Sequence, residues 1–233
     1  MKVIPAADYA IISGDFIGFS PLSAESRQAV YYLVVEGSAR LMQLFSDAMP
    51  ESVDVFRGDG WQMILTDPGV VFRAGLFFRA FIRAHAPVRQ TDVRMALAVG
   101  SVDYVPAGNV SAGDGEAFRR SGKLLESMST PKAGTMRFAM DGSAAALAID
   151  GMAALAGGIA EKWTPNQARA VMGALAGMTQ QQIAAGWGKP ISHQAVGRHL
   201  KRAGWPAIRH AVAVFEEMIR KRLDRDTACQ PAC

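Results

Sequence analysis

The sequence has 233 residues, half of them apolar and a fifth charged, which is enough chain for one sizeable domain or two small ones. No stretch approaches the roughly 18 uncharged apolar residues of a membrane helix, and the start, "MKVIPAADYA", lacks a signal-peptide pattern. Both cysteines, Cys229 and Cys233, lie in the polar tail, which excludes a disulfide framework. We therefore expect a cytoplasmic protein with no membrane partner.

Charge is divided unevenly along the chain. Residues 1–160 hold 14 Lys and Arg against 16 Asp and Glu, whereas residues 161–233 hold 11 against 5. The net charge is therefore −2 in the first part and +6 in the second. This excess favours an acidic partner for the C-terminal third, such as nucleic acid. The alternative is a solvated helix face rich in arginine.

The first 140 residues alternate strand and helix patterns. Apolar strand patterns cover 8–13, 52–56, 61–65, 93–105 and 135–140, and helical patterns cover 25–49, 67–85 and 113–128. The order β-α-β-β-α-β, with one more helix and strand, predicts an α+β domain of ferredoxin-like or palm type. In such a domain an antiparallel sheet carries its helices on one face.

Helical patterns take over near residue 142. The alanine-rich stretch 142–160 predicts a connecting helix, and the change in composition marks a domain boundary. We divide the chain into a palm domain (1–141), a connecting helix (142–163), an all-α helix-turn-helix domain with a C-terminal helix (164–223) and a tail (224–233).

Two aspartates come at the ends of neighbouring strands. Asp15 follows the first strand, and Asp59 lies in the tight turn "RGDG" between the second and third. The palm order brings these strands side by side, so two carboxylates would converge and require a cation, for which Mg²⁺ or Mn²⁺ is suited. The segment from Phe16 to Phe19 would then turn into a helix with free backbone N–H groups facing a triphosphate. The other interpretation is a helix cap at Asp15 and an ordinary turn at Asp59.

Three segments resemble motifs of the class III nucleotide cyclases. They are "SGDFIGFSPLS", "FRGDGWQMIL" and "VRMALAVGSV". The resemblance implies that Asp15 and Asp59 bind metal, with the Phe16 carbonyl as a further ligand. It also implies that the phosphates lie against Phe16, Ile17, Gly18 and Phe19.

The family's catalytic helix is matched with changes. "GEAFRRSGK" (115–123) has Arg119 at the asparagine position and Lys123 at the position of the transition-state arginine. Lysine lacks the planar fork with which arginine holds a phosphate at two points. The base-selecting positions fall on Val55 and Ala112, so the bound nucleotide is left open.

The SatD-like proteins are similar over nearly the whole chain. They combine a first strand ending in Gly-Asp-Ile/Phe, a Gly-Asp hairpin, a "DGxAF" helix start and a C-terminal helix-turn-helix. Here the third feature reads "DGEAFRRSGKLLE". This resemblance implies an architecture rather than an activity.

Residues 164–204 show a helix-turn-helix pattern. Thr164 with Gln167, and Thr179 with Gln182, have capping-box spacing, and Ser192 can cap the next helix. The segment "TQQQIAAGWGKPISHQAVGRHLKRAG" resembles that of many bacterial regulators. On that analogy His193, Gln194 and Arg198 contact base edges, and Ser192, His199, Lys201 and Arg202 contact phosphates. The alternative is a helical hairpin that serves only for packing or protein contact.

The C-terminal stretch 205–223 predicts an amphipathic helix with Ile208, Val212, Phe215 and Ile219 on one stripe. This helix would fold back on the core or pair with its counterpart in a homodimer.

Three functional hypotheses result. The first is a DNA-binding regulator whose cyclase-like domain binds a nucleotide and a divalent metal with little turnover. The second is an active cyclase that acts on a nucleoside triphosphate. The third is a degenerate palm domain that serves as a dimerisation scaffold.

Overall fold

The computed structural model describes residues 1–228 except 2, 5–6, 57, 87–90 and 131–132. Five strands form one sheet: β1 (Asp8–Ile17), β2 (Asp54–Phe56), β3 (Gly60–Leu65), β4 (Asp92–Ser101) and β5 (Met136–Ala139). The helices of the first 160 residues are α1 (Ala24–Leu44), α2 (Val71–His85), α3 (Glu116–Ser127) and α4 (Ala144–Ala160), with short 3₁₀ turns η1 (Pro68–Val70) and η2 (Val110–Ala112). The C-terminal part holds α5 (Pro165–Leu175), α6 (Gln180–Ala185), α7 (His193–Arg202) and α8 (Trp205–Ala228). No helix of the described residues is both long and apolar enough to cross a membrane.

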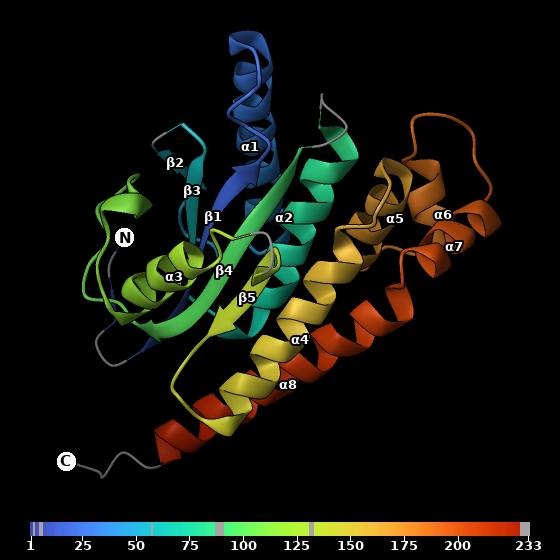
Figure 1. Ribbon diagram of the computed structural model, residues 1–233. Coiled ribbons are helices and arrows are strands. Elements are labelled where there is room, and N and C mark those ends of the chain that lie inside the picture. Colours follow the sequence, from blue (N-terminus) through green and yellow to red (C-terminus); the bar gives the residue numbers. More distant parts are fainter. Residues whose placement is uncertain (2, 5–6, 57, 87–90, 131–132, 229–233) are drawn as a thin grey trace.

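The chain has a mixed α/β fold built on a mostly antiparallel sheet. The strand order is β2-β3-β1-β4-β5, with β1 between two antiparallel neighbours (Figure 1). The predicted order of strands and helices is confirmed. The expectation of a purely antiparallel sheet is wrong for the last pair, because β5 runs parallel to β4. Parallel neighbours need a crossover connection, which α3 provides.

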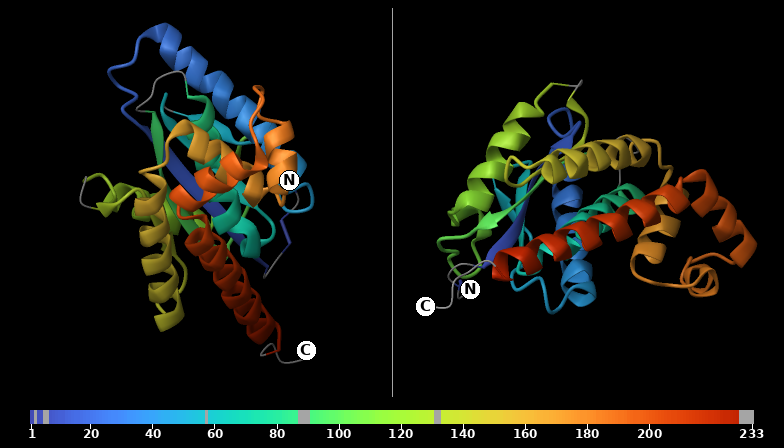
Figure 2. Two further views of the ribbon diagram at one scale, coloured as in Figure 1. Left: turned by 90° about the vertical axis from the view of Figure 1, so that its right-hand side faces the viewer. Right: turned by 90° about the horizontal axis from the view of Figure 1, so that it is seen from below.

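The expectation that all helices cover one face of the sheet is also wrong. Ala10 and Ile12 of β1 pack with α1 and α2 in the larger core, whereas Tyr9 and Ile11 pack with Phe118 of α3 in a smaller one. Figure 2 shows α3 on one side of the sheet and α2 and α8 on the other. The reason is visible in β1, whose residues from Tyr9 to Gly14 are buried on both faces. A strand that is apolar on both faces needs a cover on each.

The larger core continues across the predicted boundary near residue 142. It runs from the sheet through α4 and α5 to the buried stripe of α8. Phe215 of α8 stacks on Phe72 with ring centroids 5.0 Å apart and meets Phe138 edge-on at 5.4 Å. Of the two arrangements considered for α8, the structure therefore has the one that folds back on the core.

A buried ionic network joins the sheet to the helices behind it. Arg79 is fully buried and donates two hydrogen bonds to Asp92, at 2.9 and 2.6 Å, and a third to the Gly157 carbonyl. Arg83 donates to the same carboxylate and to the carbonyls of Glu161 and Trp163. The partners of these charges come from three places, so the network links α2, β4 and the end of α4. Each buried charge is compensated by several hydrogen bonds.

The predicted caps at Thr164, Thr179 and Ser192 are confirmed. Both capping boxes are complete, and the Ser192 hydroxyl accepts the Ala195 N–H. The helix predicted over 67–85 begins later, at Val71, after the 3₁₀ turn η1. Gly204, which has a φ of +73°, follows the end of α7. Only a residue without a side chain adopts this conformation at little cost.

Candidate functional site

Asp15 lies inside β1 rather than after it. The strand continues to Ile17, so that Asp15 pairs with Gly60 of β3 and with Arg94 of β4. Its side chain points to the face of the sheet that α3 covers, as does the buried Ser13 two residues earlier, whose hydroxyl bonds Ser121 at 2.8 Å. The cap interpretation of Asp15 is therefore wrong, because no helix begins there.

The residue before Asp15 is a glycine because the Trp61 side chain leaves no room for a larger one. The Trp61 ring, which is fully buried, lies where a side chain at position 14 would be. A Cβ atom there would come within 2.2 Å of the ring. Gly14 in "SGDF" thus has a packing role.

Arg94 holds the Asp15 carboxylate. Its guanidinium donates to both carboxylate oxygens, at 3.1 and 2.5 Å, and to the Met128 carbonyl at 2.6 Å. The side chains of Arg94 and Asp15 are 24% and 21% exposed, so the pair is partly shielded from water. Arg94 was not among the predicted site residues. The available signal was a lone arginine inside the apolar strand "VRMALAVG".

Asp59 lies in the turn that precedes β3, one residue before Gly60, the strand partner of Asp15. The turn makes Asp59 half-buried, and no ion pair or hydrogen bond of its carboxylate is present among the described residues. On the same face of the sheet, the Gln62 side-chain oxygen is buried without a described partner, while its NH₂ group donates to Ser13. The structure thus places Asp15, Arg94 and the buried Gln62 oxygen on one face of the sheet, with Asp59 in the adjoining turn.

The segment from Phe16 to Phe19 differs from its prediction. Phe16 and Ile17 are the last residues of β1 and pair with Val93 and Asp92, and Gly18 has a φ of +76°. The first helix begins at Ala24, so the expected direct turn from Phe16–Phe19 into a helix is wrong. Phe16 is buried beside the Phe19 ring, at 5.9 Å between centroids.

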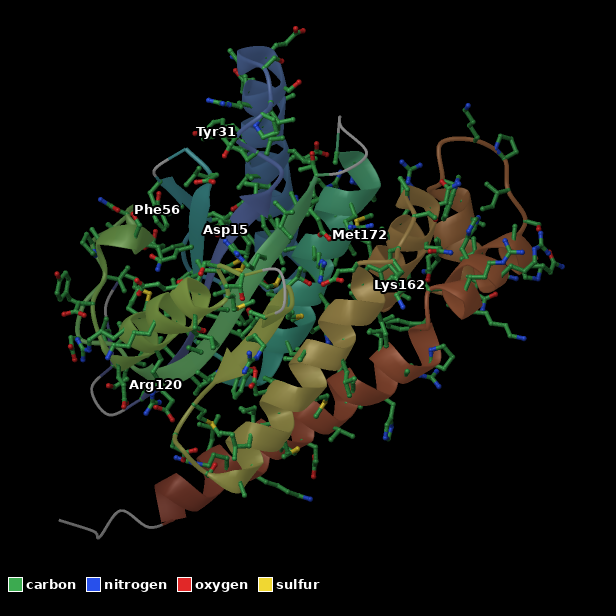
Figure 3. The ribbon with its side chains drawn as sticks, viewed as in Figure 1. Asp15, Tyr31, Phe56, Arg120, Lys162 and Met172 are labelled. Carbon is green, nitrogen blue, oxygen red and sulfur yellow. The ribbon has the colours of Figure 1, made fainter. Side chains whose placement is uncertain are left out.

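The two residues of the catalytic-helix motif are on the outer surface of α3. Arg119 pairs with Asp114 at 2.7 Å and with Asp103 at 3.6 Å, beyond the far end of β4. Arg94 and Ser101 are seven residues apart on that strand, which corresponds to about 23 Å. Figure 3 likewise shows Asp15 near one end of the sheet and Arg120, which follows Arg119, near the other. Lys123 is exposed on the same helix, and no contact of either residue with Asp15 is present among the described residues.

A pocket of about 570 Å³ opens beside the Asp15–Arg94 pair. Its lining includes Ile17 from β1, Asp92 and Arg94 from β4, and hydroxyl-bearing residues at both ends of the connection between α3 and β5. The polar lining comes from α2, from β4 and from the segments before β5 and after α4, and the volume is sufficient for a small polar ligand.

The second cluster of predicted residues is on α7. The side chains of His193, Gln194, Arg198, Lys201 and Arg202 are exposed along this helix. No acidic partner of these side chains is present in the described part of the chain. Val196 and Leu200 are buried on the opposite face, so α7 is held on α5 and α6 by its apolar side and presents its basic side to solvent.

Two of the residues predicted to contact DNA phosphates, Ser192 and His199, have structural roles in the free protein. Ser192 is the helix cap described above. His199 stacks on the buried Trp187, with centroids 5.6 Å apart, and Arg169 lies over the same indole. Partial burial, aided by the charges of Arg202 and Arg198, lowers the pKa of His199 below its ordinary value.

Gly197 permits close contact between α6 and α7. A Cβ atom at this position would lie 2.9 Å from the Gln180 side-chain oxygen. The glycine in the middle of α7 is therefore explained by packing against the preceding helix.

Comparison with known proteins identifies no relative. No family model matches the sequence, and no curated protein matches it. Among the described residues, no group of three or more His, Cys, Asp or Glu side chains is placed to hold a metal ion.

Proposed function

We propose that this protein is a DNA-binding regulator in which α6 and α7 form a helix-turn-helix and α7 enters the major groove. One observation carries the proposal. Residues 162–215 contain seven Lys and Arg and not a single Asp or Glu. Three of these cations are on the exposed side of α7. A basic surface without acidic neighbours is what binding to a phosphate backbone requires.

Each exposed α7 side chain then has a role. Gln194 and Arg198 are one turn apart and can bond base edges at two points, with His193 beside them at the start of the helix. Lys201 and Arg202, in the last turn, are suited to phosphates, which fix the register without reading sequence. The alternative of a hairpin used for protein contact alone gives no reason for this uninterrupted positive charge.

The test is titration of a fluorescent 30-base-pair duplex with the protein at several salt concentrations. We expect affinity to fall steeply with salt and to drop at least about tenfold in Arg198→Ala/Lys201→Ala, which loses two cations. Arg220→Ala on α8, a 65% exposed arginine paired with Glu217, is the matched control and leaves binding nearly unchanged. Equal binding by the wild type and the double variant would overturn the assignment of α7.

For the sheet domain we propose a palm of SatD-like or cyclase-like architecture that binds a nucleotide with Mg²⁺ or Mn²⁺. The strand order β2-β3-β1-β4 and the neighbouring positions of Asp15 and Asp59 support it. The donor set fits a hard cation, because Mg²⁺ takes oxygen ligands and usually combines one or two carboxylates with substrate phosphates. When bound, the metal would neutralise phosphate charge. Asp15 would have to release Arg94, whose guanidinium is then available to a phosphate oxygen.

We also propose that the sheet domain converts its bound nucleotide slowly or not at all. Arg119 is engaged by Asp114 and lies far along the sheet from Asp15, and Lys123 offers only a point charge. The test is calorimetry with each nucleoside triphosphate and Mn²⁺, together with mass spectrometry of the products. We expect binding that Asp15→Asn and Asp59→Asn each abolish, and no cyclic product. A metal-dependent product lost in both variants would instead establish the active cyclase. Absence of binding in the wild type would leave the sheet domain as a scaffold.

A further inference from the structure

The outer face of α4 is apolar along its whole length. The face consists of Ala144, Leu147, Ala148, Gly151, Ala154, Leu155 and Gly158, and we call it the α4 face. Leu147 and Leu155 are 72% and 74% exposed, the largest values among the exposed large apolar side chains of the described residues. The one charged residue of α4, Asp150, lies outside this face and is bound to Arg137 and to the Phe138 N–H. An exposed helix face without charge is unusual unless a partner covers it.

The α4 face is also nearly the same when read in either direction. With Gly151 as centre, alanines lie three residues before and after it, leucines lie four before and after, and small residues lie seven before and after. These spacings are those of one helical stripe. A second copy rotated by 180° about an axis through Gly151 would therefore place Leu147 against Leu155 of the other chain.

From this symmetry we propose that the protein forms a homodimer by antiparallel packing of α4 on α4, with a two-fold axis at Gly151. A two-fold interface uses the same patch on both chains, so the patch must complement itself. An unrelated partner would not need this symmetry. A Cβ atom built on Gly151 or Gly158 meets nothing within 4 Å, so both glycines leave room for the backbone of another helix to approach.

Charges at the ends of α4 agree with the antiparallel arrangement. Lys162 is exposed 11 positions after Gly151 and has no acidic partner among the described residues, whereas Asp141 comes 10 positions before it. Within its own chain Asp141 is ion-paired with Arg222 and accepts a hydrogen bond from the Ser143 hydroxyl. In the dimer each Lys162 would therefore add a second cation beside the Asp141–Arg222 pair of the other chain. Glu161, the other charge at this end, is held by Thr135 at 2.7 Å. Antiparallel helices also place opposite dipole ends together.

The area of the α4 face determines how tightly the proposed dimer should associate. A helix of 17 residues is about 26 Å long, so the patch covers less than the roughly 800 Å² per partner of a standard interface. We therefore expect a dimer that dissociates in the micromolar range. This interface uses neither the Asp15 site nor α7, so its test is independent of the proposed function.

The first experiment is sedimentation velocity from about 1 to 100 µM. We expect the wild type to pass from monomer to dimer and Leu147→Glu and Leu155→Glu to remain monomeric. Both positions are exposed, so folding should be retained, which circular dichroism checks. Val35→Glu, at a 50% exposed apolar position on α1, is the matched control and should still dimerise. A wild type that stays monomeric throughout this range would overturn the proposal. So would a dimer that persists in both α4 variants, or a monomer that binds lipid vesicles through this face.

Cysteine cross-linking tests the axis itself. In a background with Cys229→Ser and Cys233→Ser, Gly151→Cys should give a covalent dimer on mild oxidation, because a residue on the axis meets its own copy. Leu147→Cys and Leu155→Cys should cross-link little when each is oxidised alone and efficiently when mixed. Efficient cross-linking of either leucine position with itself would overturn the antiparallel register.

Discussion

At the scale of single residues, Asp150 shows how a side chain completes the edge of the sheet. One of its oxygens accepts both the Phe138 N–H of β5, at 2.9 Å, and the Arg137 Nε, at 2.8 Å, and the other accepts a second Arg137 donor. The carboxylate thus pairs an amide that would otherwise be open at an edge strand. Burial by itself would raise the pKa of Asp150, but the hydrogen bonds from Arg137 and Phe138 outweigh it and hold the pKa below its ordinary value.

We predict that Asp150→Asn lowers the free energy of unfolding by about 1–2 kcal/mol at pH 7, because two charge-assisted bonds are lost at a partly solvated site. The folded pKa is lowered, so the contribution of Asp150 is complete above the ordinary value near 3.9 and is lost as pH falls below it. Urea unfolding at pH 7 and pH 3 should therefore show a difference that is smaller in acid. A difference at pH 3 as large as that at pH 7 would contradict this origin.

Arg94 occupies both oxygens of the Asp15 carboxylate, so its removal should affect metal binding there. Arg94→Gln should free the Asp15 carboxylate and so increase the affinity for Mn²⁺ several-fold, which enhanced water-proton relaxation can measure. Lost bonds to Asp15 and Met128 should also cost about 1–3 kcal/mol of stability. The control Arg94→Gln/Asp15→Asn should bind no Mn²⁺. Equal Mn²⁺ binding by the wild type, Arg94→Gln and the double variant would argue against a metal site at Asp15.

The sequence predicted part of this site and missed the rest for a physical reason. Asp15 and Asp59 were placed together because strand order alone determines which strand ends are neighbours. Arg94 is 79 residues from Asp15, and only the register of β1 against β4 aligns them. A shift of one residue would turn Arg94 to the other face, and no local pattern determines that register.

At the scale of elements, α8 depends on aromatic contacts with the sheet domain. Phe215 is fully buried against Phe72 and Phe138. We predict that Phe215→Ala lowers the free energy of unfolding by about 3–5 kcal/mol, since the lost contacts leave a cavity between α8 and the core. Tyr32→Ala on α1, where the side chain is 61% exposed, should cost far less in the same urea titration. A loss below about 1 kcal/mol would indicate that α8 is not packed there in solution.

The stack of His199 on Trp187 supports α7 and should depend on pH. Because the folded pKa is lowered, the stack contributes fully above the ordinary histidine value near 6.5 and is lost as pH falls through the folded pKa. We predict that an NMR titration finds the His199 imidazole titrating below that ordinary value. Arg202→Gln should raise its pKa only slightly, since burial is the larger cause. A titration at or above the ordinary value would contradict the stacked geometry.

Elements with local signals were predicted well, and those that depend on tertiary pairing were not. Thr164 and Thr179 begin helices because their capping boxes are satisfied within four residues. By contrast, β1 extends four residues beyond its predicted end, because β3 and β4 supply partners for Gly14 and Asp15 on both sides. The face on which α3 lies could have been inferred from the burial-prone "YAII" run, which leaves no polar face on β1.

At the scale of the whole molecule, one core joins the sheet to the helices that carry α7. Ala168, Val171 and Leu175 of α5 are buried in the same cluster as the residues of α2, and Arg83 of α2 binds the carbonyls just before α5. α5 therefore packs on α2 of the sheet domain as well as on α6 and α7. A change in the sheet domain can reach α7 only through this shared packing, which is a contiguous route for coupling two sites.

A shared core predicts cooperative unfolding of the full chain. We expect one calorimetric transition whose measured enthalpy equals the van't Hoff enthalpy, because neither part keeps its core without the other. A fragment spanning residues 161–228 should be unable to fold alone, since removing α2 and the sheet exposes α5 and the Phe215 stripe of α8 to water. Such a fragment should show no cooperative melting and no DNA binding that Arg198→Ala weakens. Two separate transitions in the full chain, or a fragment that melts cooperatively, would mean that the helical part is an autonomous domain and that the contact of α2 with α5 is only a docking surface.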